Sequence, residues 1–208
     1  MDLLERGIGE LGIGGGDREV GRIRRFLHEL ELWNPKLNLV KASGDDLIVR
    51  HILDSLAAVP VLRETPGIDI GDIGSGNGLP GILLAAWLCD RRFFLIERSG
   101  RRCAFLRNAA AVCRLQNVEV LQQPLGAVRG SFDVCVFRAL GKLQPLAGDL
   151  CRAVRDGGVC IGYKGKHAVA EEEASELRSR GFEADVVPVR VPFLNEERCF
   201  IMFRHAAK

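Results

Sequence analysis

The sequence predicts one α/β domain whose mostly parallel, seven-stranded sheet carries helices on both faces. Beyond Gly67, short apolar runs alternate with helical stretches, which is typical of parallel sheets. Only residues 192–197 link the last two runs, and so short a link permits a hairpin but no crossover. We therefore expect one antiparallel strand. A glycine-rich segment also follows the first run directly, as in nucleotide-binding folds.

The composition is that of a folded globular protein. The 208 residues are 47% hydrophobic and 27% charged, with a formal net charge of +2. The longest apolar run, residues 82–89, is far shorter than the ~20 residues that span a bilayer. The first residues include Asp2 and Glu5 and do not resemble a signal peptide. We expect a cytoplasmic, monomeric protein with no membrane partner.

The seven cysteines do not suggest a disulfide framework or a metal site. Their number is odd and no two form a C-x-x-C pair. Most of them lie in apolar runs, so we interpret them as small buried side chains.

Residues 1–66 are expected to form a helical extension packed on the core, and residues 67–208 the α/β domain. The glycine-rich residues 1–16 are predicted to be loose. Apolar side chains recur at helical spacing over residues 17–33, and Asn34-Pro35 is expected to end that helix. A second helix is predicted over residues 45–63, before the break at Thr65-Pro66-Gly67.

Apolar runs and turn residues then define the elements of the domain. The predicted strands are residues 68–73, 93–97, 118–121, 132–137, 158–163, 184–191 and 198–203. The predicted helices are residues 80–88, 100–115, 142–154 and 168–180. Strands of this length separated by such helices are βαβ units.

The most informative segment is Asp72-Ile73-Gly74-Ser75-Gly76-Asn77-Gly78-Leu79-Pro80-Gly81. Glycines after a strand and before a helix let a ligand approach the backbone closely. Dinucleotides and S-adenosylmethionine both use such a loop. Asp72 before the first glycine, the early Gly74-x-Gly76-x-Gly78 spacing and Pro80 at the helix start favour S-adenosylmethionine.

Glu97 ends the next predicted strand, where a carboxylate can accept both ribose hydroxyls of a nucleoside. The alternative is a surface carboxylate that balances Arg98 and Arg101. The turn between Leu121 and Gly126 is the expected place of an adenine contact.

Arginines gather in two stretches. Residues 91–107 contain six arginines and one acid, and residues 18–25 contain four arginines. Such clusters fit an anionic partner such as nucleic acid. From charge alone we favour the alternative, which is a solvated helix face.

From Trp33 to Phe203 the chain resembles the RsmG family, also called GidB. The resemblance is carried by Trp33-Asn34, Asn38-Leu39, Arg50-His51-Ile52-Leu53-Asp54-Ser55, the Asp72–Gly81 loop, Gly100-Arg101-Arg102, Phe105-Leu106-Arg107, Arg138-Ala139, Lys164-Gly165 and Glu197-Arg198. It implies a class I S-adenosylmethionine-dependent methyltransferase of Rossmann-like fold. The implied reaction methylates N7 of a guanine in small-subunit (16S) ribosomal RNA, and the implied partner is that RNA or the 30S subunit.

The resemblance also implies site residues. Together with the glycine loop, the expected cofactor contacts are Asp72, Gly74, Gly76, Gly78, Leu79, Glu97, Leu125, Gly126 and Arg138. The expected substrate-side residues are Asn38, Arg50, His51, Asp54, Arg138, Lys164 and Arg198. Arg50, His51 and Asp54 share one helical face, which either borders the site or packs the N-terminal helices on the sheet. Arg138 either contacts cofactor or guanine, or pairs with Asp133 or Glu97.

No general base and no metal are expected, because guanine N7 carries a free lone pair at neutral pH. Positioning then supplies most of the catalysis. Three alternatives stay open: the same fold acting on another RNA or a small molecule, an NAD(P)-dependent oxidoreductase, and a non-catalytic RNA-binding protein. The absence of a catalytic Tyr/Lys pair disfavours the oxidoreductase, and the intact glycine loop disfavours the RNA-binding protein.

Overall fold

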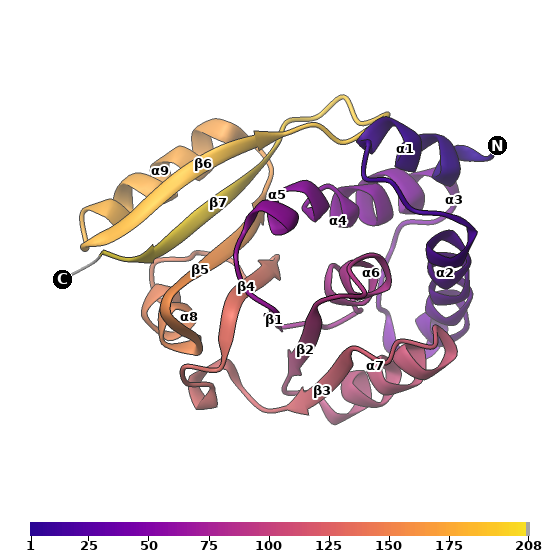
Figure 1. Ribbon diagram of the computed structural model, residues 1–208, viewed down its shortest axis with the longest axis horizontal. Helices are drawn as coiled ribbons and strands as arrows, with labels where there is room; N and C mark the ends of the chain where they lie inside the picture. The colour runs from indigo at the N-terminus through magenta and orange to yellow at the C-terminus, as the bar shows by residue number, and fades with distance from the viewer. Residues whose placement is uncertain (207–208) are drawn as a thin grey trace.

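The computed structural model describes residues 1–206, which form a seven-stranded sheet between two layers of helices (Figure 1). The strand order is β3-β2-β1-β4-β5-β7-β6. The bounds are β1 (Asp69–Ile73), β2 (Arg92–Glu97), β3 (Val118–Gln122), β4 (Phe132–Arg138), β5 (Val154–Lys164), β6 (Phe182–Val189) and β7 (Arg198–His205). β7 runs antiparallel to both of its neighbours and the other pairs are parallel, so the predicted sheet is confirmed.

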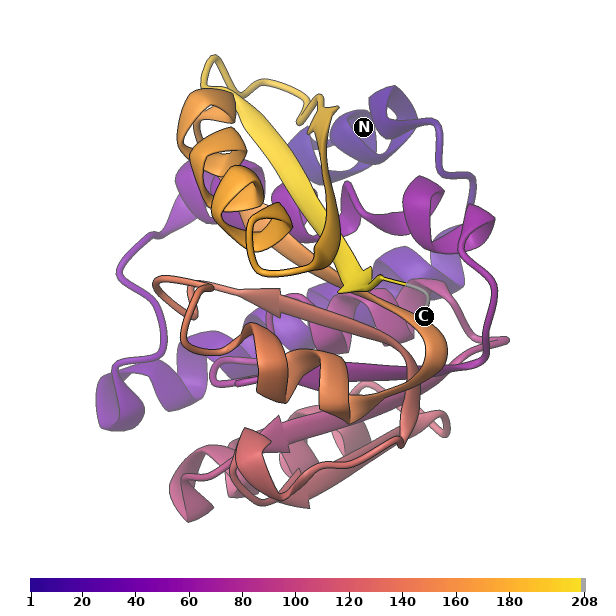
Figure 2. The ribbon, with the colours of Figure 1, turned by 90° about the vertical axis from the view of Figure 1, so that its left-hand side faces the viewer.

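The helices divide between the two faces of the sheet. They are α1 (Leu3–Leu11), α2 (Asp17–Leu37), α3 (Gly44–Leu47), the π-helical η1 (Ile48–Leu53), α4 (Asp54–Leu56), α5 (Val59–Glu64), α6 (Gly81–Trp87), α7 (Gly100–Val112), the 3-10 turn η2 (Leu125–Ala127), α8 (Ala147–Ala153) and α9 (His167–Arg178). α8 and α9 lie on one face, and Figure 2, seen from their side, places the N-terminal helices behind the sheet.

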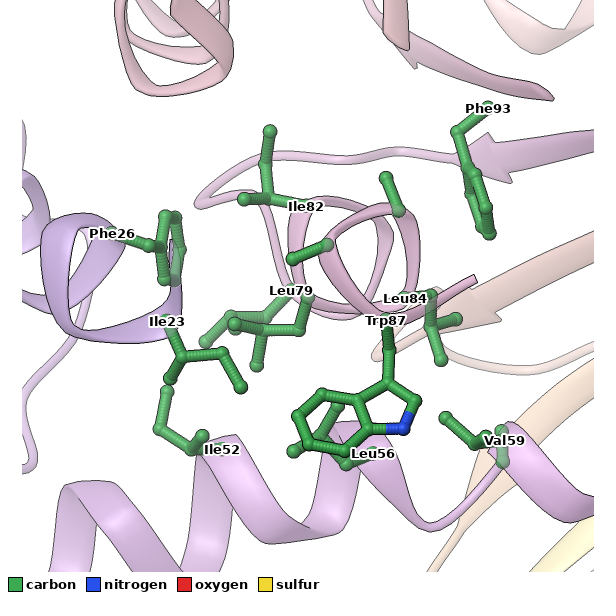
Figure 3. Close-up of a cluster of buried hydrophobic side chains, with 14 of the residues drawn as sticks. Ile23, Phe26, Ile52, Leu56, Val59, Leu79, Ile82, Leu84, Trp87 and Phe93 are labelled. Atoms are coloured by element: carbon green, nitrogen blue, oxygen red, sulfur yellow. The ribbon is translucent and has the colours of Figure 1, made fainter. Parts of the chain in front are cut away.

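Two hydrophobic clusters fill the space between sheet and helices. One joins α6, α7 and the N-terminal helices to the sheet, and the other lies under α8 and α9. Figure 3 shows the first: Ile23 and Phe26 of α2 and Ile52 of η1 point toward Ile82 and Trp87 of α6. Burying a side chain of this size contributes roughly 1.5–3 kcal/mol. The N-terminal helices therefore share a core with the sheet.

The N-terminal segment is not loose, contrary to the expectation for residues 1–16. Asp2 accepts a hydrogen bond from the Glu5 amide, and the Glu5 side chain accepts one from the Asp2 amide, so the two form a capping box. Leu4 and Ile8 are buried in the core. The prediction of a loose segment rested on glycine content alone, which does not reveal a capping box or the burial of two side chains.

The helix expected to end at Asn34-Pro35 continues to Leu37, and Gly16 occupies its N-cap position. The side-chain oxygen of Asn34 accepts hydrogen bonds from the amides of Leu39 and Val40. That contact fixes the turn after the helix, and it offsets the usual cost of a residue before proline in helical conformation.

The predicted single helix over residues 45–63 is four short pieces, with a π-helical turn at η1. Such turns are rare and occur mostly as single turns inside α-helices, so the prediction of one continuous α-helix missed it. The helix predicted over residues 142–154 is shorter, because α8 begins only at Ala147 and ends at Ala153, directly before β5.

Among residues 1–206, no helix combines the length and the apolar composition needed to cross a bilayer. All seven cysteines are free thiols, and all but Cys89 are buried.

Candidate functional site

A cavity of about 1250 Å³ opens at the carboxyl ends of four neighbouring strands. Ile73 of β1, Glu97 of β2, Arg138 of β4 and Lys164 of β5 all line it. The strand order reverses between β1 and β4, and open α/β sheets bind their ligands in the crevice at such a point. The cavity is larger than a typical small-molecule site of about 300–1000 Å³, so a cofactor and a substrate group fit together.

The glycine loop forms one wall of this cavity. The amides of Gly74 and Ser75 donate to the carbonyl of Ile96 at 2.9 and 3.1 Å, which ties the loop to β2. Gly74 and Gly76 line the cavity with φ values of 71° and 49°, a region that L side chains rarely adopt. Gly78, with φ 80°, faces buried side chains of the core instead of the cavity.

Asp72 lies beneath the loop and does not line the cavity. Its Oδ2 accepts a hydrogen bond from the Gly81 amide at 3.2 Å, and its carbonyl accepts one from the Ser75 hydroxyl at 2.8 Å. Complete burial raises the pKa of the Asp72 carboxyl to about 7, although its hydrogen bonds oppose the shift. In this structure Asp72 holds the loop against the start of α6.

Glu97 is 6% exposed, which excludes the alternative of a surface carboxylate. Its Oε2 accepts from the Gly76 amide at 3.0 Å and its Oε1 from the Ser99 amide at 2.8 Å. Each carboxylate oxygen has two lone-pair sites, so both keep room for a hydroxyl donor. The carboxylate lies at the end of β2 and lines the cavity.

A charged cluster forms the opposite wall. Oδ2 of Asp54 lies 3.2 Å from Nη1 of Arg138, and Oδ1 lies 3.1 Å from Nε of Arg198. The pairing of Arg138 with Asp133 or Glu97 considered from the sequence does not occur. Burial raises the pKa of the Asp54 carboxyl, although both guanidinium groups oppose the shift. The cluster lines the cavity and also joins η1 and α4 to the sheet, so the two interpretations of this helical face both apply.

His51 belongs to the same cluster. Its Nδ1 lies 3.4 Å from Nη2 of Arg138, and a guanidinium can only donate. Burial and the charges of Arg138, Arg50 and Arg198 lower the pKa of His51 to about 4, so the ring is neutral at pH 7.

Of the remaining expected residues, most line the cavity. Leu79, Leu125, Gly126, Arg50 and Lys164 do so, and Arg50 and Lys164 form ion pairs with Glu196 and Glu173 respectively. Asn38 does not line the cavity, because it is the left-handed C-cap of α2 and is exposed to solvent.

The structure adds cavity residues that were not among the expected site residues. Leu39, Asn77 and Tyr163 line the wall, and so do Arg98 and Arg102 from the arginine cluster. The hydroxyl of Tyr163 donates to the Ser55 carbonyl at 2.7 Å. Burial raises the pKa of that hydroxyl well above its ordinary value, so Tyr163 stays neutral. Its place at the end of β5 was the only sequence signal available.

The residues present fit a nucleoside with an attached amino-acid chain. Backbone amides and positive φ values at Gly74 and Gly76 provide close approach, and the Glu97 carboxylate provides hydroxyl acceptors. Within residues 1–206, no three His, Cys, Asp or Glu side chains are placed to hold a metal ion.

Comparisons with known proteins agree with this geometry. The family model described as rRNA small subunit methyltransferase G matches residues 20–201. A protein of that name from Treponema pallidum is 38% identical over 183 residues, covering 85% of this chain and 81% of its own. Another from Coxiella burnetii is 33% identical and covers 95% of this chain and 94% of its own.

Solved structures share the fold at low sequence identity. A precorrin-6y C5,15-methyltransferase from Geobacter metallireducens superposes with a TM-score of 0.58 at 17% identity, covering 79% of this chain and 94% of its own. A SAM-dependent methyltransferase from Aquifex aeolicus gives 0.57 at 16% identity, covering 77% and 92%. These likenesses show a class I methyltransferase fold. The match over residues 20–201 shows that the chain belongs to the rRNA small subunit methyltransferase G (GidB) family.

Proposed function

We propose that this protein transfers a methyl group from S-adenosylmethionine to N7 of a guanine in small-subunit ribosomal RNA. The observation that carries the proposal is the buried Glu97 carboxylate, which lies at the end of β2 and accepts a hydrogen bond from the glycine loop. The chain belongs to the rRNA small subunit methyltransferase G family. The same proposal places the protein in the cytoplasm, with the 16S RNA or the 30S subunit as its partner.

Two groups of residues have separate tasks in this proposal. Glu97 would accept the ribose hydroxyls, the backbone at Gly74 and Gly76 would follow the amino-acid chain, and Leu125-Gly126 would border the adenine. Asp72 and Gly78 would support the loop from below. When bound, the cofactor supplies an electrophilic methyl group on a sulfonium.

Positioning is the main task of the protein. Guanine N7 is unprotonated at neutral pH, so no side chain has to remove a proton. Arg138 is fixed by Asp54 at the end of β4, beside the cavity. A guanidinium there would hold guanine O6 or the cofactor, because donation to N7 itself would block the reacting lone pair. A base that reacts inside a cavity also has to leave its stack.

The first test is calorimetric titration with S-adenosylhomocysteine on the wild type, Glu97→Ala and Glu119→Ala. Glu119 is an exposed carboxylate on β3 and serves as the matched control. We expect the wild type and Glu119→Ala to bind equally and Glu97→Ala to bind at least about tenfold more weakly, since it loses charge-assisted hydrogen bonds. Absence of binding by the wild type would overturn the cofactor assignment.

The second test identifies the product. Unmodified small-subunit RNA and 30S particles are incubated with methyl-labelled S-adenosylmethionine, and the digested RNA is analysed by mass spectrometry. We expect 7-methylguanosine. Label in another nucleoside, or none in either substrate, would reject the proposed reaction.

A further inference from the structure

The cations expected to contact substrate are neutralised by acids of the protein itself. Arg138 and Arg198 share Asp54, and Lys164 pairs with Glu173. Arg50 pairs with Asp46 at 3.3 Å and with Glu196 at 2.6 Å. This wall of the cavity therefore offers little net positive charge to a phosphate group.

The opposite wall differs. Arg98, Arg101 and Arg102 are exposed, and none of their guanidinium groups forms an ion pair or a hydrogen bond with any residue from 1 to 206; the Arg102 amide alone donates to the Ser99 hydroxyl. Arg98 and Arg102 line the cavity, and Arg101 lies in the same first turn of α7 as Arg102. The six arginines of the cluster thus divide into two sets.

The other three arginines of the cluster have structural partners. Arg91 donates to the carbonyls of Thr65 and Gly67, Arg92 pairs with Asp69, and Arg107 donates to the Val120 carbonyl. Of the six arginines, only Arg98, Arg101 and Arg102 have guanidinium groups without a partner among residues 1–206.

The placement of these arginines is unfavourable for the helix. The start of a helix carries partial positive charge and favours acids, but the first turn of α7 contains no acid and two arginines. Residues that break a local rule without a compensating contact are expected at functional sites.

We infer that Arg98, Arg101 and Arg102 bind backbone phosphates of the substrate RNA next to the target nucleotide, whereas the Asp54 cluster does not. The inference rests on the proposed function. Arginine binds phosphate in a bidentate manner, and an RNA whose base enters the cavity brings its flanking phosphates to the cavity rim. The surface that charge alone assigns to a solvated helix face is thus the docking surface for the RNA backbone.

The test compares two triple variants of the full chain. One carries Arg98→Gln, Arg101→Gln and Arg102→Gln. The control carries Arg63→Gln, Arg129→Gln and Arg180→Gln, which removes the same charge from exposed arginines that do not line the cavity and form no ion pair with residues 1–206. The RNA is transcribed small-subunit RNA or the 30S particle, whichever the wild type methylates.

We expect the first variant to raise KM for the RNA at least tenfold, with kcat and the affinity for S-adenosylhomocysteine within twofold of the wild type. The logarithm of the RNA-binding constant falls linearly with the logarithm of the salt concentration. The variant should make this negative slope shallower by about 2, at ~0.7 for each phosphate that the protein no longer neutralises. The control should keep the KM and slope of the wild type.

Three outcomes would contradict the inference. An unchanged slope and an unchanged KM would show that these arginines form a solvated helix face and do not bind the RNA. Loss of S-adenosylhomocysteine binding would assign them to the cofactor, since Arg102 Nη1 lies only 3.8 Å from a Cβ built on Gly76. An equal loss in the control would show a general charge effect. If the wild type methylates no RNA, it is the proposed function that fails.

Discussion

The carboxylate of Asp54 connects the N-terminal helices to the strand ends that line the cavity, because its Oδ2 lies 3.2 Å from Nη1 of Arg138. Its other oxygen holds Arg198 at the start of β7. One buried side chain thus fixes two guanidinium groups that come from strands far apart in the sequence.

Asp54→Asn should therefore destabilise the protein. Burial offsets much of the attraction between the ions, but removal of the Asp54 charge leaves Arg138 without an acidic partner and leaves Arg198 with only the exposed Glu196, at 3.4 Å. We expect a loss of about 3 kcal/mol in the free energy of unfolding, measured with urea. Asp46→Asn, at an exposed partner of Arg50, should cost less than about 0.5 kcal/mol. If Asp54→Asn unfolds at the urea concentration of the wild type, Asp54 does not have this role.

His51 should stay neutral throughout the physiological pH range. Burial and three neighbouring arginines lower its pKa to about 4, so its ring signals should not titrate above pH 5.5 in an NMR series. His51→Gln identifies those signals by their absence. The unfolded chain takes up a proton on this ring near pH 6.5, but the folded protein does so only near pH 4. The contribution of His51 to the free energy of unfolding should therefore decline as pH falls from 6.5 toward 4. A midpoint near 6.5 would show that the arginines do not surround the ring in solution.

The sequence was sufficient for the fold because the sheet depends on strong local patterns. Apolar runs, helical spacing and the short link before β7 each reflect burial on one face of an element. The position of the glycine loop and of Glu97 beside the cavity was predictable for a similar reason, because both lie at the ends of consecutive strands. Such features need no knowledge of distant contacts.

What the sequence did not reveal depends on contacts between distant residues. Asp54 and Arg198 are far apart in the chain, so their pairing had no local pattern. The helix at Leu3–Leu11 depends on a capping box and on burial of Leu4 and Ile8, which glycine content obscured. The division of the arginine cluster into paired and unpaired sets required knowledge of which acids lie nearby.

Asp72 should make stability depend on pH. Its pKa is about 7 in the folded protein because the carboxyl is buried, whereas the unfolded chain has the ordinary value of 3.8. The unfolded state therefore releases its proton first, and the wild type should lose stability as pH rises from 4 to 7. Asp72→Asn cannot ionise at this position and should not lose this stability. The free energy of unfolding of the variant minus that of the wild type should therefore increase between pH 4 and 7, by on the order of 4 kcal/mol.

Urea unfolding at pH 4, 5, 6 and 7 measures this difference. Asp185→Asn, at an exposed carboxylate on β6, provides the control. Its free energy of unfolding relative to the wild type should not show the increase with pH that is expected for Asp72→Asn. A constant difference between Asp72→Asn and the wild type would mean that the carboxyl ionises normally in the folded state.

Gly81→Ala should damage the cofactor loop through packing. A Cβ at Gly81 would lie 2.5 Å from Oδ2 of Asp72 and 2.4 Å from Cδ2 of Leu95, so α6 would have to move away from the sheet. We expect a loss of about 1–3 kcal/mol in stability and weaker binding of S-adenosylhomocysteine, because the loop before α6 moves with the helix. Gly9→Ala in α1 meets no atom within 4 Å and should stabilise the protein by up to about 1 kcal/mol. Thermal unfolding and calorimetry measure both effects, and unchanged cofactor affinity in a destabilised Gly81→Ala protein would show that the loop is positioned independently of α6.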